Sequence, residues 1–130
     1  MSDPIKPYRL DFEERPSYLY ARVSAETIER ESALEYLKEV AARLNASGCE
    51  HLMLERDIPV MLPEGDLFFT TRDFLELVGQ ARIAFVNTHA PIHDNMEFAI
   101  MIGTNRGANY RLFNDAAKAE EWLIAGAKAR

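Results

Sequence analysis

The chain has little cysteine, no excess of basic residues and no long apolar run. Of its 130 residues only Cys49 is a cysteine, so no disulfide can form within the chain, and we expect a reducing, cytoplasmic compartment. Lys and Arg number 15 against 21 Asp and Glu, a formal net charge of −6, which argues against binding to the nucleic-acid backbone. No apolar run approaches the roughly 20 residues of a membrane span. We therefore expect neither a nucleic-acid partner nor a membrane span.

The spacing of apolar residues predicts an α/β fold, as one domain over residues 8–130 after a flexible lead-in over 1–7. Residues 8–12 and 17–23 alternate between apolar and polar, and Pro16 separates them, which is typical of a β-hairpin. Short apolar runs then alternate with amphipathic stretches, which favours parallel strand pairing. We expect a single mixed sheet of about five strands, with the first antiparallel at an edge, and about four helices. The expected helices are 26–46, 66–79, 91–106 and one that Asn114-Asp115 caps; the expected buried strands are 52–54, 83–86 and 110–113.

Three glycines mark the expected ends of the first three helices. Gly48, Gly79 and Gly107 each follow the last residue of an amphipathic stretch, where glycine is favoured because it adopts the left-handed conformation.

Three stretches carry a resemblance to a known family. They are Gly48-Cys49 before the strand at 52–54, Asn105-Arg106-Gly107 before the last strand, and Arg111-Leu112-Phe113-Asn114-Asp115 with Ala119 and Trp122-Leu123 after it. Together with the order of elements, over residues 8–125, they resemble the STAS domain, and more closely its SpoIIAA-like (STAS/SEC14-domain) branch. The resemblance implies a regulatory domain similar to anti-sigma-factor antagonists, with a protein partner and a phosphorylatable serine where the second helix starts.

The chain departs from this family at the phosphorylation motif. Residues 57–71 contain no serine, and Thr70 and Thr71 are the only hydroxyls near the start of the second helix. A phosphate near a helix N-terminus is electrostatically favourable, so these two threonines are the phosphorylation candidates. The alternative is that they are ordinary threonines of a helix start.

An apolar excess lies in residues 58–69, which are expected to be mostly loop. Loops are usually polar, so this segment either folds over its own sheet edge, forms a lid on an apolar pocket, or meets a partner. Residues 98–102 are apolar on every side of the expected helix, which favours self-association, with a dimer as the expected state. The candidate ligand or partner surface consists of Met61, Leu62, Phe68, Phe69, Phe98, Met101 and Ile102.

Polar residues follow two of the expected strands, and ligands of open α/β sheets gather at such strand ends. Arg56, Asp57, His89 and His93 are therefore candidates to line one crevice, with solvated loop residues as the alternative. His89 and His93 have a spacing that suits zinc on a helix, but Pro91 lies between them and no third ligand is evident. We expect no metal and no cofactor.

No nucleophile, base and orienting group are recognisable together in the sequence. We therefore expect a non-enzymatic binding or regulatory domain that acts through protein contacts. The alternative is a small carrier or sensor of an apolar, lipid-like ligand held under residues 58–69.

Overall fold

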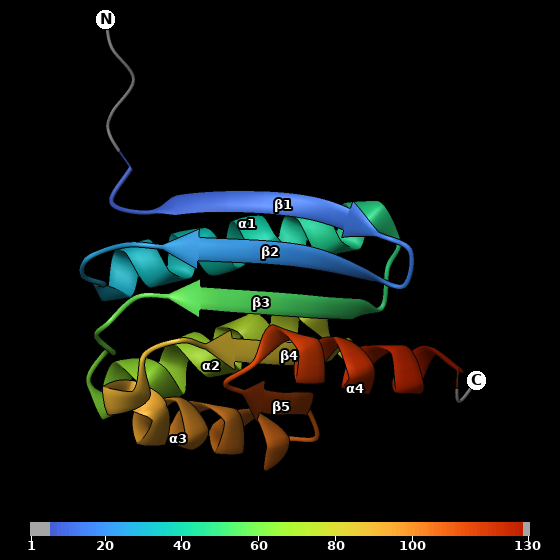
Figure 1. Ribbon diagram of the computed structural model, residues 1–130. Helices are drawn as coiled ribbons and strands as arrows, with labels where there is room; N and C mark the ends of the chain where they lie inside the picture. The colour runs from blue at the N-terminus through green and yellow to red at the C-terminus, as the bar shows by residue number, and fades with distance from the viewer. Residues whose placement is uncertain (1–5, 129–130) are drawn as a thin grey trace, which may run out of the picture.

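The structure, a computed structural model, describes residues 6–128, which build one five-stranded sheet with helices on both of its faces (Figure 1). Residues 1–5, most of the expected lead-in, lie outside the described residues. The strands are β1 (Arg9–Arg15), β2 (Tyr18–Ser24), β3 (His51–Asp57), β4 (Arg82–Asn87) and β5 (Asn109–Phe113). The helices are α1 (Arg30–Ser47), α2 (Glu64–Val78), the 3₁₀ turn η1 (Ala90–Ile92), α3 (His93–Thr104) and α4 (Ala116–Lys128).

The strand pairing confirms the predicted fold class. The order across the sheet is β1-β2-β3-β4-β5, with β1 antiparallel to β2 at one edge and the other neighbours parallel. Each parallel connection carries at least one helix, as parallel pairing requires.

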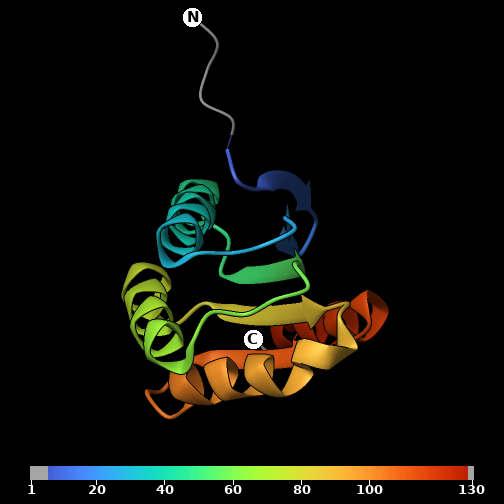
Figure 2. The ribbon, with the colours of Figure 1, turned by 90° about the vertical axis from the view of Figure 1, so that its left-hand side faces the viewer.

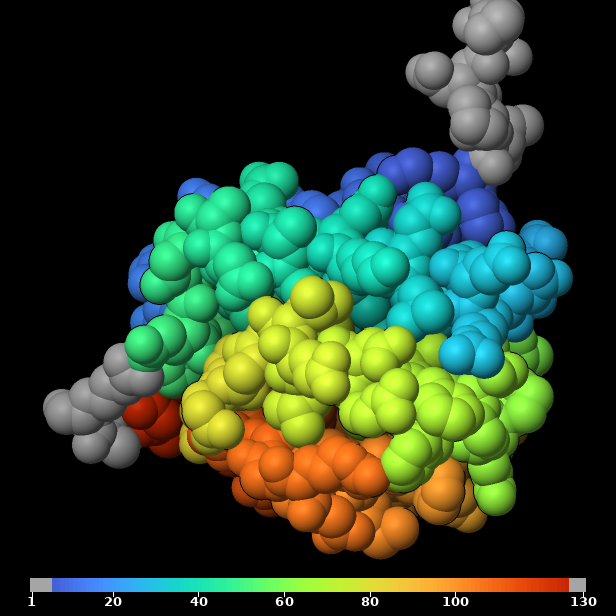
Figure 3. Space-filling view, turned by 180° about the vertical axis from the view of Figure 1, so that it is seen from behind, coloured from blue at the N-terminus to red at the C-terminus, as the bar shows by residue number. Residues whose placement is uncertain are grey.

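The two faces of the sheet bury different helices. Leu19, Leu52, Leu54 and Ile83 pack with α1 and α2 into the larger core, and α3 joins this side against α2 and β5. Figure 2 shows α1 and α2 on one side of the sheet and α4 on the other, and Figure 3 shows α1, α2 and α3 together on the rear face. On the front face, α4 covers a smaller core that includes Met53.

The first helix begins later than its sequence pattern suggested. Glu29 is extended and forms a capping box with Ser32, so α1 starts at Arg30 rather than at residue 26. Its predicted end is correct, because Gly48 takes the left-handed conformation with φ 72° directly after Ser47.

The region expected as one helix over 91–106 is two elements. Pro91 lies in the 3₁₀ turn η1, and α3 follows from His93 to Thr104. Gly107 (φ 87°) therefore lies in the turn before β5, three residues beyond α3, and does not cap the helix directly. The second helix begins at Glu64, two residues before its expected start, because the amide of Leu67 already donates to the Pro63 carbonyl.

The last helix is held at its start and in its middle. The Asp115 carboxylate accepts hydrogen bonds from the amides of Ala117 and Lys118, as its predicted capping role requires. Arg82 of β4 lies 3.6 Å from the centre of the Trp122 ring and donates to the Trp122 carbonyl.

None of the helices in residues 6–128 has both the length and the apolar character that crossing a membrane requires.

Candidate functional site

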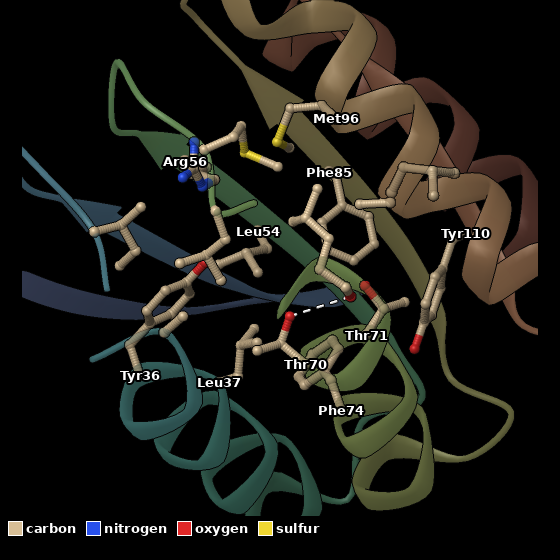
Figure 4. Close-up of a pocket in the computed structure, with 17 residues that line it drawn as sticks. Tyr36, Leu37, Leu54, Arg56, Thr70, Thr71, Phe74, Phe85, Met96 and Tyr110 are labelled. Carbon is tan, nitrogen blue, oxygen red and sulfur yellow. Dashed lines mark hydrogen bonds between the residues drawn. The ribbon is translucent and has the colours of Figure 1, made fainter. Parts of the chain in front are cut away.

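A pocket of about 70 Å³ lies between the larger-core face of the sheet and helices α1, α2 and α3 (Figure 4). Leu54 and Arg56 of β3 and Phe85 of β4 form its sheet side, and Met61 and Leu62 approach from the loop before α2. The buried lining residues form its floor, whereas others keep partial exposure and form its rim. The rim residues are Ile28, Leu37, Met61, Thr71, Phe85, Ala99 and Ile100.

Residues 58–69 both pack into the larger core and line this pocket. Ile58, Leu62 and Leu67 are buried in the larger core, while Val60 (41% exposed) and Phe69 (39%) face outward. The apolar excess of the segment thus divides between the core, the pocket wall and the surface.

The two threonines of α2 differ in their surroundings. The Thr70 side chain is buried, and its hydroxyl donates to the carbonyls of Asp66 and Leu67 within the helix. Thr71 is partly exposed and lines the pocket. Of the two phosphorylation candidates, Thr71 therefore has the more accessible hydroxyl.

One end of the pocket is aromatic. The ring centre of Tyr110 lies 5.2 Å from that of Phe85 and 6.4 Å from that of Phe74. The Tyr110 ring also packs against Gly103, where a Cβ atom would lie 2.7 Å from its Cδ2. The Tyr110 hydroxyl is buried without a hydrogen-bond partner among the described residues, and burial raises the pKa of this phenol.

The other end carries Arg56, which is only 5% exposed. Its Nη1 donates to the Ile58 carbonyl at 3.0 Å and its Nη2 to the Val60 carbonyl at 2.6 Å. Arg56 thereby fixes the start of the loop that leads into α2. Figure 4 shows Arg56 and Tyr110 at opposite ends of the lining.

Asp57 and His89 meet on the opposite face of the sheet from Arg56. The Nε2 atom of His89 lies 2.7 Å from Oδ1 of Asp57, and Arg22 donates to Oδ2 of Asp57 at 2.7 Å and to Glu55 at 3.0 Å. The hydrogen bond to Glu55 is the main cause that raises the pKa of Arg22. Each carboxylate of this cluster thus holds a cationic side chain or the histidine ring.

Arg22 and Glu55 belong to this cluster although neither was predicted as a site residue. Alternation along a strand places Glu55 and Asp57 on one face, and Arg22 lies opposite Glu55 in the parallel register. This alternation of side chains along the strands was the sequence signal that could have identified Arg22 and Glu55.

The four polar candidates do not line one crevice. Arg56 lies at the pocket and Asp57 with His89 on the other face, whereas His93 of α3 pairs with Glu97 one turn later, at 3.1 Å. Within residues 6–128, no three His, Cys, Asp or Glu side chains gather in a group that could hold a metal ion.

The candidate surface residues also separate. Leu62 and Ile102 belong to the buried core, while Met61, Phe68 and Phe98 are partly buried. Phe69 and Met101 (49% exposed) reach the surface. Two guanidinium groups lie near the Phe69 ring, with Arg30 5.3 Å and Arg72 5.1 Å from its centre.

No protein-family model matches the chain, and no curated protein matches it in sequence.

Proposed function

We propose that the chain is a non-enzymatic binding domain, STAS-like in architecture, that takes a small and largely apolar ligand into the pocket beneath residues 58–71. The observation that carries this proposal is the position of the pocket. It lies under the segment whose apolar excess stood out in the sequence, and Met61, Leu62 and Leu67 of that segment line it.

The volume limits the size of the ligand. An engineered cavity of about 150 Å³ accepts benzene, and this pocket has about half that volume, about 70 Å³. We therefore propose a small molecule in place of the lipid-sized ligand that the sequence suggested. Met61 and Phe85 at the rim are partly exposed, and we propose that such a molecule enters beside them.

Native mass spectrometry of the purified chain tests this function. We expect a retained or added small ligand to bind one site per chain. Ala99→Met, which adds side-chain volume at the rim, should abolish that binding, whereas Ala117→Met on the exposed surface of α4 should not. Equal binding by both variants would place the ligand outside the pocket.

A protein partner is the second candidate, and the surroundings of Phe69 favour it. Interface hot spots are enriched in aromatic residues and arginine, and here the guanidinium groups of Arg30 and Arg72 both lie near the ring of an exposed phenylalanine. A second copy of the chain or a regulatory partner would bind here, with phosphorylation at Thr71 as the associated switch. A cytoplasmic location belongs to the same proposal, supported by the single cysteine.

Light scattering of the wild type and of Phe69→Ser tests self-association. A dimer that Phe69→Ser converts to a monomer supports it, while a wild type that remains monomeric at about 100 μM contradicts it. Persistent labelling of Thr71→Ala by a kinase-containing lysate would exclude Thr71 as the switch.

A further inference from the structure

Among the described residues that line the pocket, Arg56 alone carries a charge. It is only 5% exposed, and none of the ion pairs between described side chains includes it. A buried charge is costly unless it is paired or well hydrogen-bonded. The cation is therefore held by carbonyl dipoles alone within the described structure.

The hydrogen bonds of Arg56 leave part of its capacity unused. A guanidinium has five N–H groups, and the carbonyls of Ile58 and Val60 accept two of them. If Arg56 served only to hold the loop before α2, these two hydrogen bonds would be sufficient. The remaining N–H groups have no acceptor among the described residues, so a ligand that enters the pocket beside Arg56 would meet an unpaired cation.

The rest of the lining decides what kind of acceptor fits. Leu54, Phe85 and Met96 extend from Arg56 toward the aromatic end (Figure 4). Arg56 is opposite Asn87 in the sheet register and Tyr110 is opposite Ile83, four residues earlier on β4. That offset corresponds to about 13 Å along the strands. The pocket is thus cationic at one end and apolar toward the other.

We propose that the ligand is a short-chain monocarboxylate, whose carboxylate pairs with Arg56 and whose carbon chain lies against Leu54, Phe85 and Met96. This inference rests on the proposed function and names its ligand class. One cation in an apolar wall matches one negative charge; a phosphate dianion would retain an uncompensated charge. The fork of an arginine also fits the two oxygens of a carboxylate.

The pocket volume of about 70 Å³ limits the carbon chain beyond the carboxylate to about three carbons, half of the six carbons of benzene that the cavity of about 150 Å³ holds. Longer acids would require the loop at Met61 to move outward.

The experiment is calorimetric titration of the wild-type chain with butyrate and with butyramide, its neutral counterpart of nearly equal size. We expect one site for butyrate and binding of butyramide that is weaker by about tenfold or more, as expected for loss of a charge-assisted hydrogen bond. Affinity should rise from acetate to butyrate and fall at hexanoate. This comparison requires no variant, so it holds even if a substitution at Arg56 impairs folding.

Substitutions at Arg56 test whether its guanidinium is the group that recognises the negative charge of the ligand. Arg56→Met should lose the preference for butyrate over butyramide, and Arg56→Lys should retain it in part. Arg9→Met, at an arginine whose side chain is 78% exposed, should behave as the wild type. A folded Arg56→Met that still prefers butyrate would overturn the inference, because another group would then recognise the charge.

Failure of the ligand class and failure of the proposed function give different results. If butyramide binds as tightly as butyrate and Ala99→Met removes both, the pocket binds ligands but Arg56 does not select their charge. Xenon is a neutral probe for apolar cavities. If xenon perturbs the NMR signals of the pocket residues but neither butyrate nor butyramide binds, the carboxylate class is wrong. If neither acid, amide nor xenon binds there, both proposals fall.

Discussion

Removing the Tyr110 hydroxyl should stabilise the protein. Tyr110 is 6% exposed, and its hydroxyl has no hydrogen-bond partner among the described residues. A buried hydroxyl without a partner costs about 1–3 kcal/mol. Tyr110→Phe removes that cost and leaves a void of about 12 Å³, worth roughly 0.3 kcal/mol. We therefore expect a gain of about 1–2 kcal/mol in the free energy of unfolding.

The matched control is Tyr8→Phe. Tyr8 is equally buried at 6%, but its hydroxyl lies 3.1 Å from carboxylate oxygens of both Glu35 and Glu39. Loss of hydrogen bonds to charged acceptors should destabilise the protein by about 1–2 kcal/mol. The same substitution at equal exposure should therefore act with opposite signs at the two positions.

The assay is equilibrium unfolding in urea, followed by the fluorescence of Trp122, the only tryptophan. At an m value of about 2 kcal/mol per molar urea, Tyr110→Phe should raise the midpoint by about 0.5–1 M. A lowered midpoint would refute the reasoning, because it would mean that the hydroxyl has a partner, such as a bound water or ligand.

A pH series provides a second readout of the same hydroxyl. Burial raises the pKa of Tyr110 above its ordinary value of 10.0. Above about pH 10 the unfolded chain therefore binds fewer protons than the folded chain, and stability falls as the pH rises. Tyr110→Phe should lose less stability than the wild type in that range.

Three further predictions concern the surroundings of the site. Gly103→Ala should destabilise the protein by about 1–2 kcal/mol in urea unfolding, because its Cβ atom would lie 2.7 Å from the Tyr110 ring; an unchanged midpoint would mean that the ring moves freely. Asp115→Ala should cost about 1 kcal/mol in the same assay, because it removes the cap of α4, and Asp115→Asn should retain most of it. Burial, together with Arg82, lowers the pKa of His51, so wild-type stability should fall as the pH decreases below about 6.5. His51→Gln should show less of that decline, and an identical decline in both proteins would exclude His51 as its cause.

The fold was largely predictable from the sequence because its pattern is regular. Alternation at period two marked the hairpin, and short apolar runs between amphipathic stretches marked the parallel strands. The ends of elements were less predictable, because they depend on individual hydrogen bonds. The capping box of Glu29 and Ser32 shortens α1, and Pro91 lies in the separate 3₁₀ turn η1 that precedes α3.

The candidate site was predictable only in part. Residues 58–69 stood out by composition, and some of them do line the pocket. Arg56 and Asp57 were assigned to one crevice because β3 was expected to end at residue 54. The strand continues to Asp57, so these neighbours point to opposite faces of the sheet. Arg22 and Tyr110 come close to the site residues only through strand register, which the composition of a segment does not reveal.

The methyl groups of the methionines test the central claim most directly. Met61 and Met96 line the pocket, whereas Met53 is buried on the α4 side of the sheet and Met101 is exposed on α3. In a titration of methyl-¹³C-methionine-labelled protein with butyrate, the signals of Met61 and Met96 should shift together and saturate. Those of Met53 and Met101 should remain in place. Saturable shifts confined to Met53 or Met101, or no shift at Met61 and Met96, would contradict a ligand pocket beneath residues 58–71.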